Sequence, residues 1–225
     1  MPRAFLFDID NTLLYTGGAG SLAMNLAFQE LYGVADAFAR VEFTGRSDLY
    51  ILQEGLALNG IEGRPADHVE SFTRCYCSLL PKTLREREGH LMPGFPQILE
   101  ALSGEPDVRI GLATGNFSES ARLKLQHYGL SSFFSGGGFG EDDVDRAQVV
   151  RRAIERVADG ARPADVFVIG DTQHDITSAL ANGVVAVGVA TGGQSAKDLQ
   201  AAGAHLVFTD FSDWRSAAAK LLARA

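Results

Sequence analysis

The stretch Phe5-Leu6-Phe7-Asp8-Ile9-Asp10-Asn11-Thr12-Leu13 is an apolar run that ends in two acidic residues. The run predicts a buried β-strand over residues 4–8. Because side chains alternate along a strand, Asp8 and Asp10 would then project toward the same region at its carboxyl end, where open α/β sheets bind ligands. Two carboxylates this close repel unless a cation or a shared proton relieves them, so the pair indicates a Mg²⁺ site or a nucleophile beside an acid/base. An acidic surface turn is the alternative.

The composition restricts the class of protein. The chain has 225 residues, with 20 basic and 28 acidic side chains and a net charge of −8. The basic residues are scattered, so we expect no nucleic-acid partner. No apolar stretch approaches the roughly 20 residues that span a bilayer, and no signal-peptide pattern precedes the first strand, so we expect a cytoplasmic protein without a membrane partner. Cys75 and Cys77 are predicted to be reduced helix residues.

Short β-rich runs recur along the chain and are separated, in its second half, by segments with apolar residues at helical spacing. Strand alternating with helix predicts an α/β fold with a doubly wound parallel sheet. The predicted strands cover residues 4–8, 108–114, 165–170, 184–189 and 205–208.

One segment breaks the alternation. Residues 16–91 have helical periodicity and no convincing strand, which predicts an inserted helical domain in a core made of residues 1–15 and 92–225. Glycine permits unusual backbone angles and proline stops a helix, so the flanking segments 16–20 and 89–94 are predicted linkers. Inside the insertion, we expect the main helices at residues 22–32, 49–59 and 66–87.

Two further clusters follow predicted strands. Thr114, Gly115 and Asn116 supply side-chain and backbone donors suited to a phosphate, although an ordinary turn with a helix N-cap uses the same residues. Asp171 and Asp175 could each serve a helix start alone. With Asp8 and Asp10, however, they would bring four carboxylates to one rim, which requires a divalent cation, and Mg²⁺ suits oxygen ligands better than zinc does. His174 is expected on the helix surface.

In order and spacing, these clusters resemble the first, second and fourth motifs of the haloacid dehalogenase superfamily, and the resemblance covers essentially the whole chain. The matching segments are Asp8-x-Asp10-x-Thr12, Thr114-Gly115-Asn116 and Gly170-Asp171-x-x-x-Asp175. The resemblance implies a Rossmann-like core. It also implies that residues 16–91 are a helical cap like that of the phosphoglycolate phosphatase and β-phosphoglucomutase group.

The resemblance also implies roles for individual residues. Asp8 would attack phosphorus to form an aspartyl-phosphate, while Asp10 would protonate the leaving oxygen and then activate water. Mg²⁺ would be held by Asp8, the main-chain carbonyl of Asp10 and Asp171, with Asp175 supporting the site.

The third motif departs from the family pattern, which has a lysine. No lysine lies between Lys124 and Lys197, and the candidate at the expected place is Arg146. Arginine keeps the charge and can bind phosphate in a bidentate manner. The alternative is that Arg146 pairs with the acidic residues that precede it.

The second carboxylate selects among reactions. Release of an alkoxide benefits from a general acid and departure of a halide does not, so Asp10 favours phosphoryl transfer over dehalogenation. A phosphonatase would need a Schiff-base lysine in the cap, where the only lysine, Lys82, lies late in a long helix. We therefore expect a Mg²⁺-dependent phosphatase for a small phosphate monoester. The alternatives are a phosphomutase of the β-phosphoglucomutase type and a non-catalytic phosphate-binding or regulatory protein.

The cap is expected to select the substrate, because the core contacts the phosphoryl group. Arg46, in the loop of residues 44–48, is the candidate for a second anionic or polar group on the substrate, unless it pairs with Asp48 or another cap acid. A small phosphorylated metabolite such as phosphoglycolate or a sugar phosphate would fit. The chain is expected to be a monomer or a homodimer.

Overall fold

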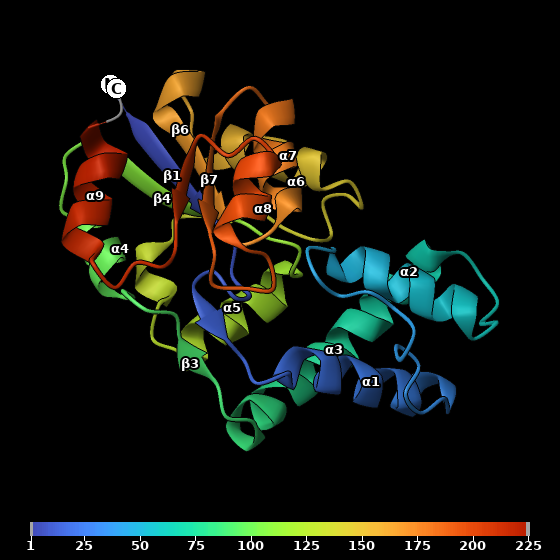
Figure 1. Ribbon diagram of the computed structural model, residues 1–225. Coiled ribbons are helices and arrows are strands. Elements are labelled where there is room, and N and C mark those ends of the chain that lie inside the picture. Colours follow the sequence, from blue (N-terminus) through green and yellow to red (C-terminus); the bar gives the residue numbers. More distant parts are fainter. Residues whose placement is uncertain (1, 224–225) are drawn as a thin grey trace.

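A parallel sheet forms the centre of the computed structural model, which describes residues 2–223 (Figure 1). Its strand order is β5-β4-β1-β6-β7-β8. Phe7 at the end of β1 is in register with Leu112 of β4 and Ile169 of β6, so these three strands end at one edge. The doubly wound α/β prediction is confirmed. The strands are β1 (Arg3–Phe7), β4 (Val108–Ala113), β5 (Gly137–Gly138), β6 (Val166–Gly170), β7 (Val185–Val189) and β8 (Leu206–Phe208).

Helices cover both faces of the sheet, which explains why the sequence of β1 after Arg3 is a continuous apolar run. Phe5 and Phe7 contribute to the cluster under α4, α5 and α9, while Ala4 and Leu6 contribute to the cluster under α6, α7 and α8. All four side chains are fully buried. The helices are α4 (Gln97–Ser103), α5 (Ser118–His127), α6 (Arg146–Val157), α7 (Gln173–Ala181), α8 (Ala196–Ala201) and α9 (Trp214–Ala223), with short 3₁₀ turns at Ser131–Phe133 and Pro163–Asp165.

Three helices form a separate layer beside the carboxyl edge of the sheet (Figure 1). They are α1 (Ala19–Tyr32), α2 (Asp48–Leu58) and α3 (Pro65–Glu86), and their ends agree with the predicted helices to within three residues. Their apolar cluster contains Phe28, whose ring lies 5.2 Å from that of Phe38 and 6.4 Å from that of Phe72. The cluster extends to Phe117 at the start of α5. The division of the chain into a core and a cap domain stays a prediction.

The two chain passages between the sheet and the helical layer pair with each other. β2 (Leu14–Tyr15) and β3 (His90–Leu91) form a two-stranded antiparallel ribbon. The expectation that residues 16–91 contain no strand is therefore wrong at its last two residues, because pairing between the two passages satisfies backbone groups that neither passage could satisfy alone. Gly17, with φ of 64°, lies against the main chain of Glu88, where a β-carbon would collide.

Two expectations from composition can be compared with the structure. Cys75 and Cys77 lie on α3, which confirms their placement on a helix, and both are half-buried and form no disulfide. Within residues 2–223, none of the helices combines the length and the apolar character that crossing a membrane requires.

Two leucines on α2 test the packing of the helical layer. Leu56 is 4% exposed and belongs to its apolar cluster, whereas Leu58 is 40% exposed. We expect Leu56→Ala to lower the free energy of unfolding by about 2–5 kcal/mol, because it leaves a cavity. The matched control, Leu58→Ala, should change it by less than about 1 kcal/mol. Urea unfolding of both variants measures this difference, and similar values would contradict the described packing.

Candidate active site

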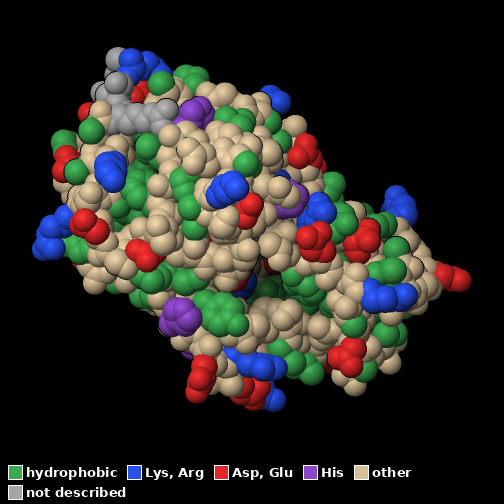
Figure 2. Space-filling view, in the orientation of Figure 1, with side chains coloured by type: hydrophobic (Ala, Val, Ile, Leu, Met, Phe, Trp, Pro, Cys, Tyr) green, Lys and Arg blue, Asp and Glu red, His purple; other side chains and the backbone are tan. Residues whose placement is uncertain are grey.

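A cavity of about 370 Å³ lies where the carboxyl edge of the sheet meets the helical layer, and Figure 2 shows the surface hollowed between these two parts. The predicted site residues Asp8, Asp10, Gly115, Asn116, Arg146, Asp171 and Arg46 all line it. Side chains from the helical layer, among them Met24, Ile51 and Tyr76, form the opposite wall. The cavity therefore combines a charged floor with a more apolar roof.

Asp8 follows the last residue of β1, and its side chain is 13% exposed. Its backbone N–H donates to the carbonyl of Ile169, which ties this position to β6. Its Oδ1 accepts a hydrogen bond of 2.7 Å from Nη2 of Arg146. Burial raises the pKa of Asp8 to about 6, although the Arg146 charge opposes this rise. The carboxylate is therefore only partly compensated by the protein.

Arg146 is the first residue of α6 and lies between two carboxylates. The same nitrogen that donates to Asp8 donates to Oδ1 of Asp175 at 2.7 Å and to the carbonyl of Ala113 at 2.8 Å. The alternative in which Arg146 pairs with the preceding acidic residues is thus wrong. One of those residues, Asp142, pairs instead with Arg156 at 2.7 Å.

Asp10 has a different set of partners. Its Oδ2 accepts from Nδ2 of Asn116 at 2.8 Å, and Nζ of Lys124 lies 2.8 Å from Oδ1 and 2.7 Å from Oδ2. The side chain of Asp10 is 39% exposed, so it remains open to the cavity. The two carboxylates of the first motif are therefore held by different cations.

The turn Thr114-Gly115-Asn116 is built around the threonine hydroxyl. Oγ1 of Thr114 accepts from the backbone N–H of Asn116 at 3.3 Å and from its Nδ2 at 2.8 Å. The amide of Asn116 is thereby turned toward Asp10. A β-carbon on Gly115 would collide with the carbonyl of Arg46, so glycine lets the loop of the helical layer approach. Phosphate binding by this turn stays a prediction.

An acidic cluster suited to a metal ion lies beside Asp8. Asp8, Asp171 and Asp175 each offer a carboxylate oxygen, and these atoms lie within 4.8 Å of one another. Oδ1 of Asp171 accepts from the hydroxyl of Thr12 at 3.3 Å, whereas its buried Oδ2 has no hydrogen-bond partner among residues 2–223. Burial, followed by the charges of Asp175 and Asp8, raises the pKa of Asp171 to about 8. An orphaned oxygen among buried carboxylates fits a hard divalent cation.

The four predicted metal residues differ in what they can offer. Oδ2 of Asp175 accepts from the backbone N–H and the hydroxyl of Thr172, so Asp175 mainly caps α7 and holds Arg146. The carboxylate of Asp10 faces Lys124 instead of the cluster. Asp8 and Asp171 are therefore the carboxylates that fit direct coordination best, while the main-chain carbonyl of Asp10 stays a predicted ligand.

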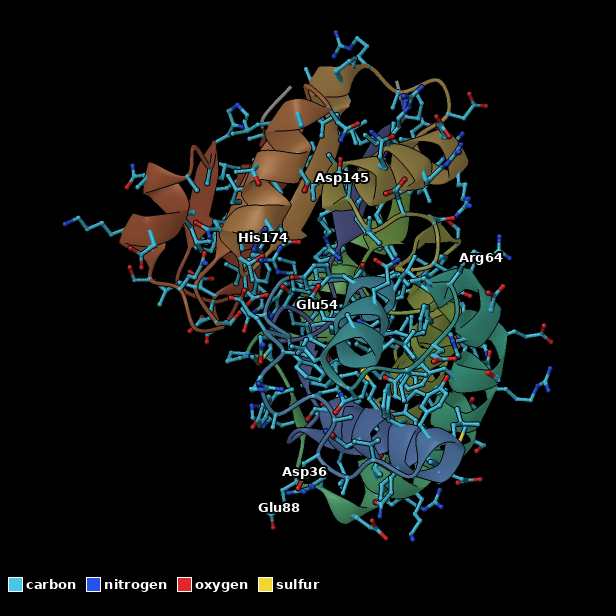
Figure 3. All side chains as sticks on the ribbon, turned by 90° about the vertical axis from the view of Figure 1, so that its right-hand side faces the viewer. Asp36, Glu54, Arg64, Glu88, Asp145 and His174 are labelled. Atoms are coloured by element: carbon cyan, nitrogen blue, oxygen red, sulfur yellow. The ribbon has the colours of Figure 1, made fainter. Side chains whose placement is uncertain are left out.

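Arg46 lines the cavity from the helical layer. Its Nη2 lies 3.3 Å from Glu42, its guanidinium stacks 4.8 Å from the ring centre of Tyr50, and its buried Nε has no hydrogen-bond partner within the described residues. Of the two alternatives for Arg46, pairing with a cap acid is observed, but that acid is Glu42. His174 is half-buried, lies against Gly45, and is found on the side of the core that faces the helical layer (Figure 3).

Two buried charged residues at the cavity, Lys124 and Asp48, make contacts that the sequence did not predict. Lys124 is 4% exposed, and its spacing of three residues from the apolar Ala121 on α5 was the only signal that it faces inward. Asp48 is 8% exposed at the start of α2, and its Oδ2 accepts from the backbone N–H of Phe117 at 2.8 Å and the hydroxyl of Ser120 at 3.1 Å. Asp48 therefore fastens the helical layer to the start of α5.

Comparison with known proteins identifies the class of protein. The family model described as haloacid dehalogenase-like hydrolase matches residues 2–183, and the chain belongs to this family. The resemblance inferred from the motifs, including the prediction of a hydrolase, is thus confirmed.

Individual relatives agree with this assignment. A phosphoglycolate phosphatase of Rhodospirillum rubrum is 27% identical over 228 residues, covering 95% of this chain and 91% of that protein. The pyrophosphatase PpaX of Bacillus velezensis is 23% identical over 206 residues, covering 88% of each. The crystal structure of CbbY from Rhodobacter sphaeroides in complex with phosphate has a TM-score of 0.71 at 19% identity, with 95% of this chain and 96% of that chain covered. This structural likeness supports the fold alone.

The burial of Asp48 predicts that the stability of the fold depends on pH. Burial raises its pKa from 3.8 to about 6, although the charge of Lys124 opposes the rise. The folded protein then keeps a proton that the unfolded chain has already lost, so the stability from this group is complete below about pH 4 and is lost as the pH rises through about 6. Asp48→Asn removes the charge while its amide oxygen can accept the same two hydrogen bonds.

Urea unfolding of both proteins across this range measures the effect. We expect the free energy of unfolding of the wild type, relative to Asp48→Asn, to fall by on the order of 1–3 kcal/mol between about pH 4 and about pH 7. Exposed Asp159 provides the control variant Asp159→Asn, for which no such trend is expected. A difference between wild type and Asp48→Asn that is constant over this range would contradict the prediction.

Proposed function

We propose that the protein is a Mg²⁺-dependent phosphatase that hydrolyses a small phosphate monoester through an aspartyl-phosphate at Asp8. The observation that supports this most strongly is that Asp8 and Asp10 line one cavity while each is paired with its own buried cation. Two neighbouring carboxylates in different environments can take different chemical roles. The family membership and the phosphatase names of the relatives support the same reaction class.

In the first step, an oxygen of Asp8 attacks phosphorus and the bond between phosphorus and the ester oxygen breaks. Asp10 gives its proton to the departing oxygen, so the product leaves as an alcohol and not as an alkoxide. Arg146, which already contacts Asp8, binds an oxygen of the transferring group and offsets its charge. This contact also weakens the case for a non-catalytic protein, which rested on arginine replacing the usual lysine.

In the second step, Asp10 takes a proton from water as the water attacks the phosphorus of the aspartyl-phosphate. The bond between phosphorus and the Asp8 oxygen breaks, inorganic phosphate leaves, and both carboxyl groups return to their starting states. Asp8 and Asp171 would hold Mg²⁺, with Asp175 orienting Arg146 beside them. The chemistry that Mg²⁺ supplies at such a site is neutralisation of the negative charge on the phosphoryl group.

The wall formed by the helical layer favours a small substrate. The cavity volume of about 370 Å³ lies at the lower end of the range for ligand sites. Arg46 would meet a second anionic or polar group, since its Nε lacks a partner within the described residues. A phosphoglycolate-like compound or a sugar phosphate has these features, and the name of the Rhodospirillum rubrum relative supports the former.

Phosphate release from a panel of esters tests the proposal. The panel contains 2-phosphoglycolate and several sugar phosphates, each assayed with Mg²⁺ and again after addition of EDTA. We expect turnover of at least one ester, its loss in EDTA, and a decrease in kcat of at least about a thousandfold in Asp8→Asn, because the nucleophile is removed. The exposed control variant Asp159→Asn should behave like the wild type. Full activity in Asp8→Asn would refute the mechanism, and tight binding of esters without turnover would favour the non-catalytic alternative.

A further inference from the structure

Lys124 is a buried cation that has no assigned role in the two steps of the proposed reaction. Its side chain is 5% exposed, although it lies in the middle of α5. Burying an ammonium group is unfavourable unless its donors find partners. Among the described residues, the partners of Nζ all belong to the cavity floor: Oδ1 of Asp10 at 2.8 Å, Oδ2 of Asp10 at 2.7 Å and Oδ1 of Asn116 at 2.6 Å. The lysine is therefore hydrogen-bonded to residues of the first and second motifs.

These bonds form a closed ring of three side chains. Nδ2 of Asn116 donates to Oδ2 of Asp10 and also to Oγ1 of Thr114, both at 2.8 Å, which fixes the orientation of the amide. Its oxygen is thereby left to accept from Lys124. Oδ1 of Asp10 accepts only from Lys124 within the described residues and so retains a free acceptor position. Within the ring, Asn116 binds Oδ2 of Asp10 and Lys124 binds both of its oxygens, while the carboxylate stays open to the cavity.

The ring is separate from the contacts of the nucleophile. Arg146 pairs with Asp8 and Asp175, and Lys124 pairs with Asp10. Loss of Lys124 should therefore disturb Asp10 without removing the cation at Asp8. We infer that Lys124 is a positioning residue that fixes the carboxyl group of Asp10 for proton transfer to the leaving oxygen and from water, an inference that rests on the proposed phosphatase reaction.

This role predicts a dependence on the leaving group. p-Nitrophenolate leaves without a proton, whereas the alkoxide of glycerol 2-phosphate needs one. A misplaced Asp10 should thus slow formation of the phosphoenzyme from the alkyl ester and spare its formation from the aryl ester. Because Asp10 also serves the second step, the first turnover is the informative quantity, and rapid-quench or stopped-flow measurement resolves it.

The experiment compares first-turnover rates of both esters, with Mg²⁺, in the wild type and in Lys124→Met, which removes the charge and the donors. We expect a fall of about 100-fold or more for glycerol 2-phosphate, the usual contribution of a general acid. For p-nitrophenyl phosphate the rate should change less than about fivefold, with a burst of p-nitrophenolate followed by slow turnover. Lys124→Arg keeps the charge and N–H donors and should restore most of the alkyl-ester rate.

Two controls isolate the ring. Lys82 is 66% exposed and lies 3.7 Å from Glu86 on α3, so Lys82→Met should leave both rates unchanged. In an Asp10→Asn background, Lys124→Met should cause no further loss with the alkyl ester, since the group that it positions is already absent. If Lys124→Met does not fold, Asn116→Leu breaks the same ring and should show the same bias between the esters.

Three results would overturn the inference: equal losses for both esters, a rise in KM with unchanged kcat, or a further loss in the Asp10→Asn background. Failure of the proposed function is distinguishable from these. A wild-type protein that hydrolyses neither of these esters, nor 2-phosphoglycolate or any sugar phosphate of the panel, refutes the phosphatase and this role together. A wild type that hydrolyses both esters, with an unchanged ratio in Lys124→Met, refutes only the role of Lys124.

Discussion

Repulsion among carboxylates at one edge of the sheet is the constraint on which the arrangement of the site depends. β1 and β6 are parallel neighbours, so Asp8 and Asp171 come to the same edge, and Asp175 joins them from the first turn of α7. Such a group is unstable in a buried site unless cations offset it. Arg146 offsets part of it with two contacts of 2.7 Å, and Oδ2 of Asp171, which has no partner among residues 2–223, is available to a metal ion.

The two cations that the protein supplies at this edge lie on different helices. Arg146 is the first residue of α6, and Lys124 is the seventh of the ten residues of α5. Each is bonded to a different carboxylate of the first motif, so the proposed nucleophile Asp8 and the proposed acid/base Asp10 lie beside different cations. The proposed division of labour between two aspartates two residues apart thus has an electrostatic basis in the residues around them.

The loop of residues 44–48, which leads into α2, attaches the helical layer to the core beside the site. The backbone N–H of Asp48 donates to the carbonyl of Gly115 at 2.7 Å, and its carboxylate binds the start of α5. The second motif therefore forms part of the cavity floor and also contacts the loop that contains Arg46. This contact links the position of the proposed phosphate-binding turn to that of the loop that contains Arg46.

How much of this could be predicted from the sequence depends on the range of each interaction. The strands and the first motif are local patterns, and Arg146 was found because the family resemblance implies a cation just before the helix that precedes the fourth-motif strand. Lys124 was missed because its partner Asp10 lies 114 residues away and the contact depends on how α5 is rotated. The edge strand β5 consists of two glycines, so it has no side-chain pattern to recognise. The role of Asp48 likewise depends on how the helical layer docks, which no local pattern contains.

The central claim is that Asp8 accepts the phosphoryl group, and trapping that group tests it most directly. The wild-type protein is mixed with p-nitrophenyl phosphate and Mg²⁺, quenched in acid within milliseconds, digested and examined by mass spectrometry. The account predicts a phosphoryl group on the peptide that contains Asp8, at the position of that residue, and none in Asp8→Asn. Turnover without a trapped phosphoryl group, or a phosphoryl group on another residue, would contradict it.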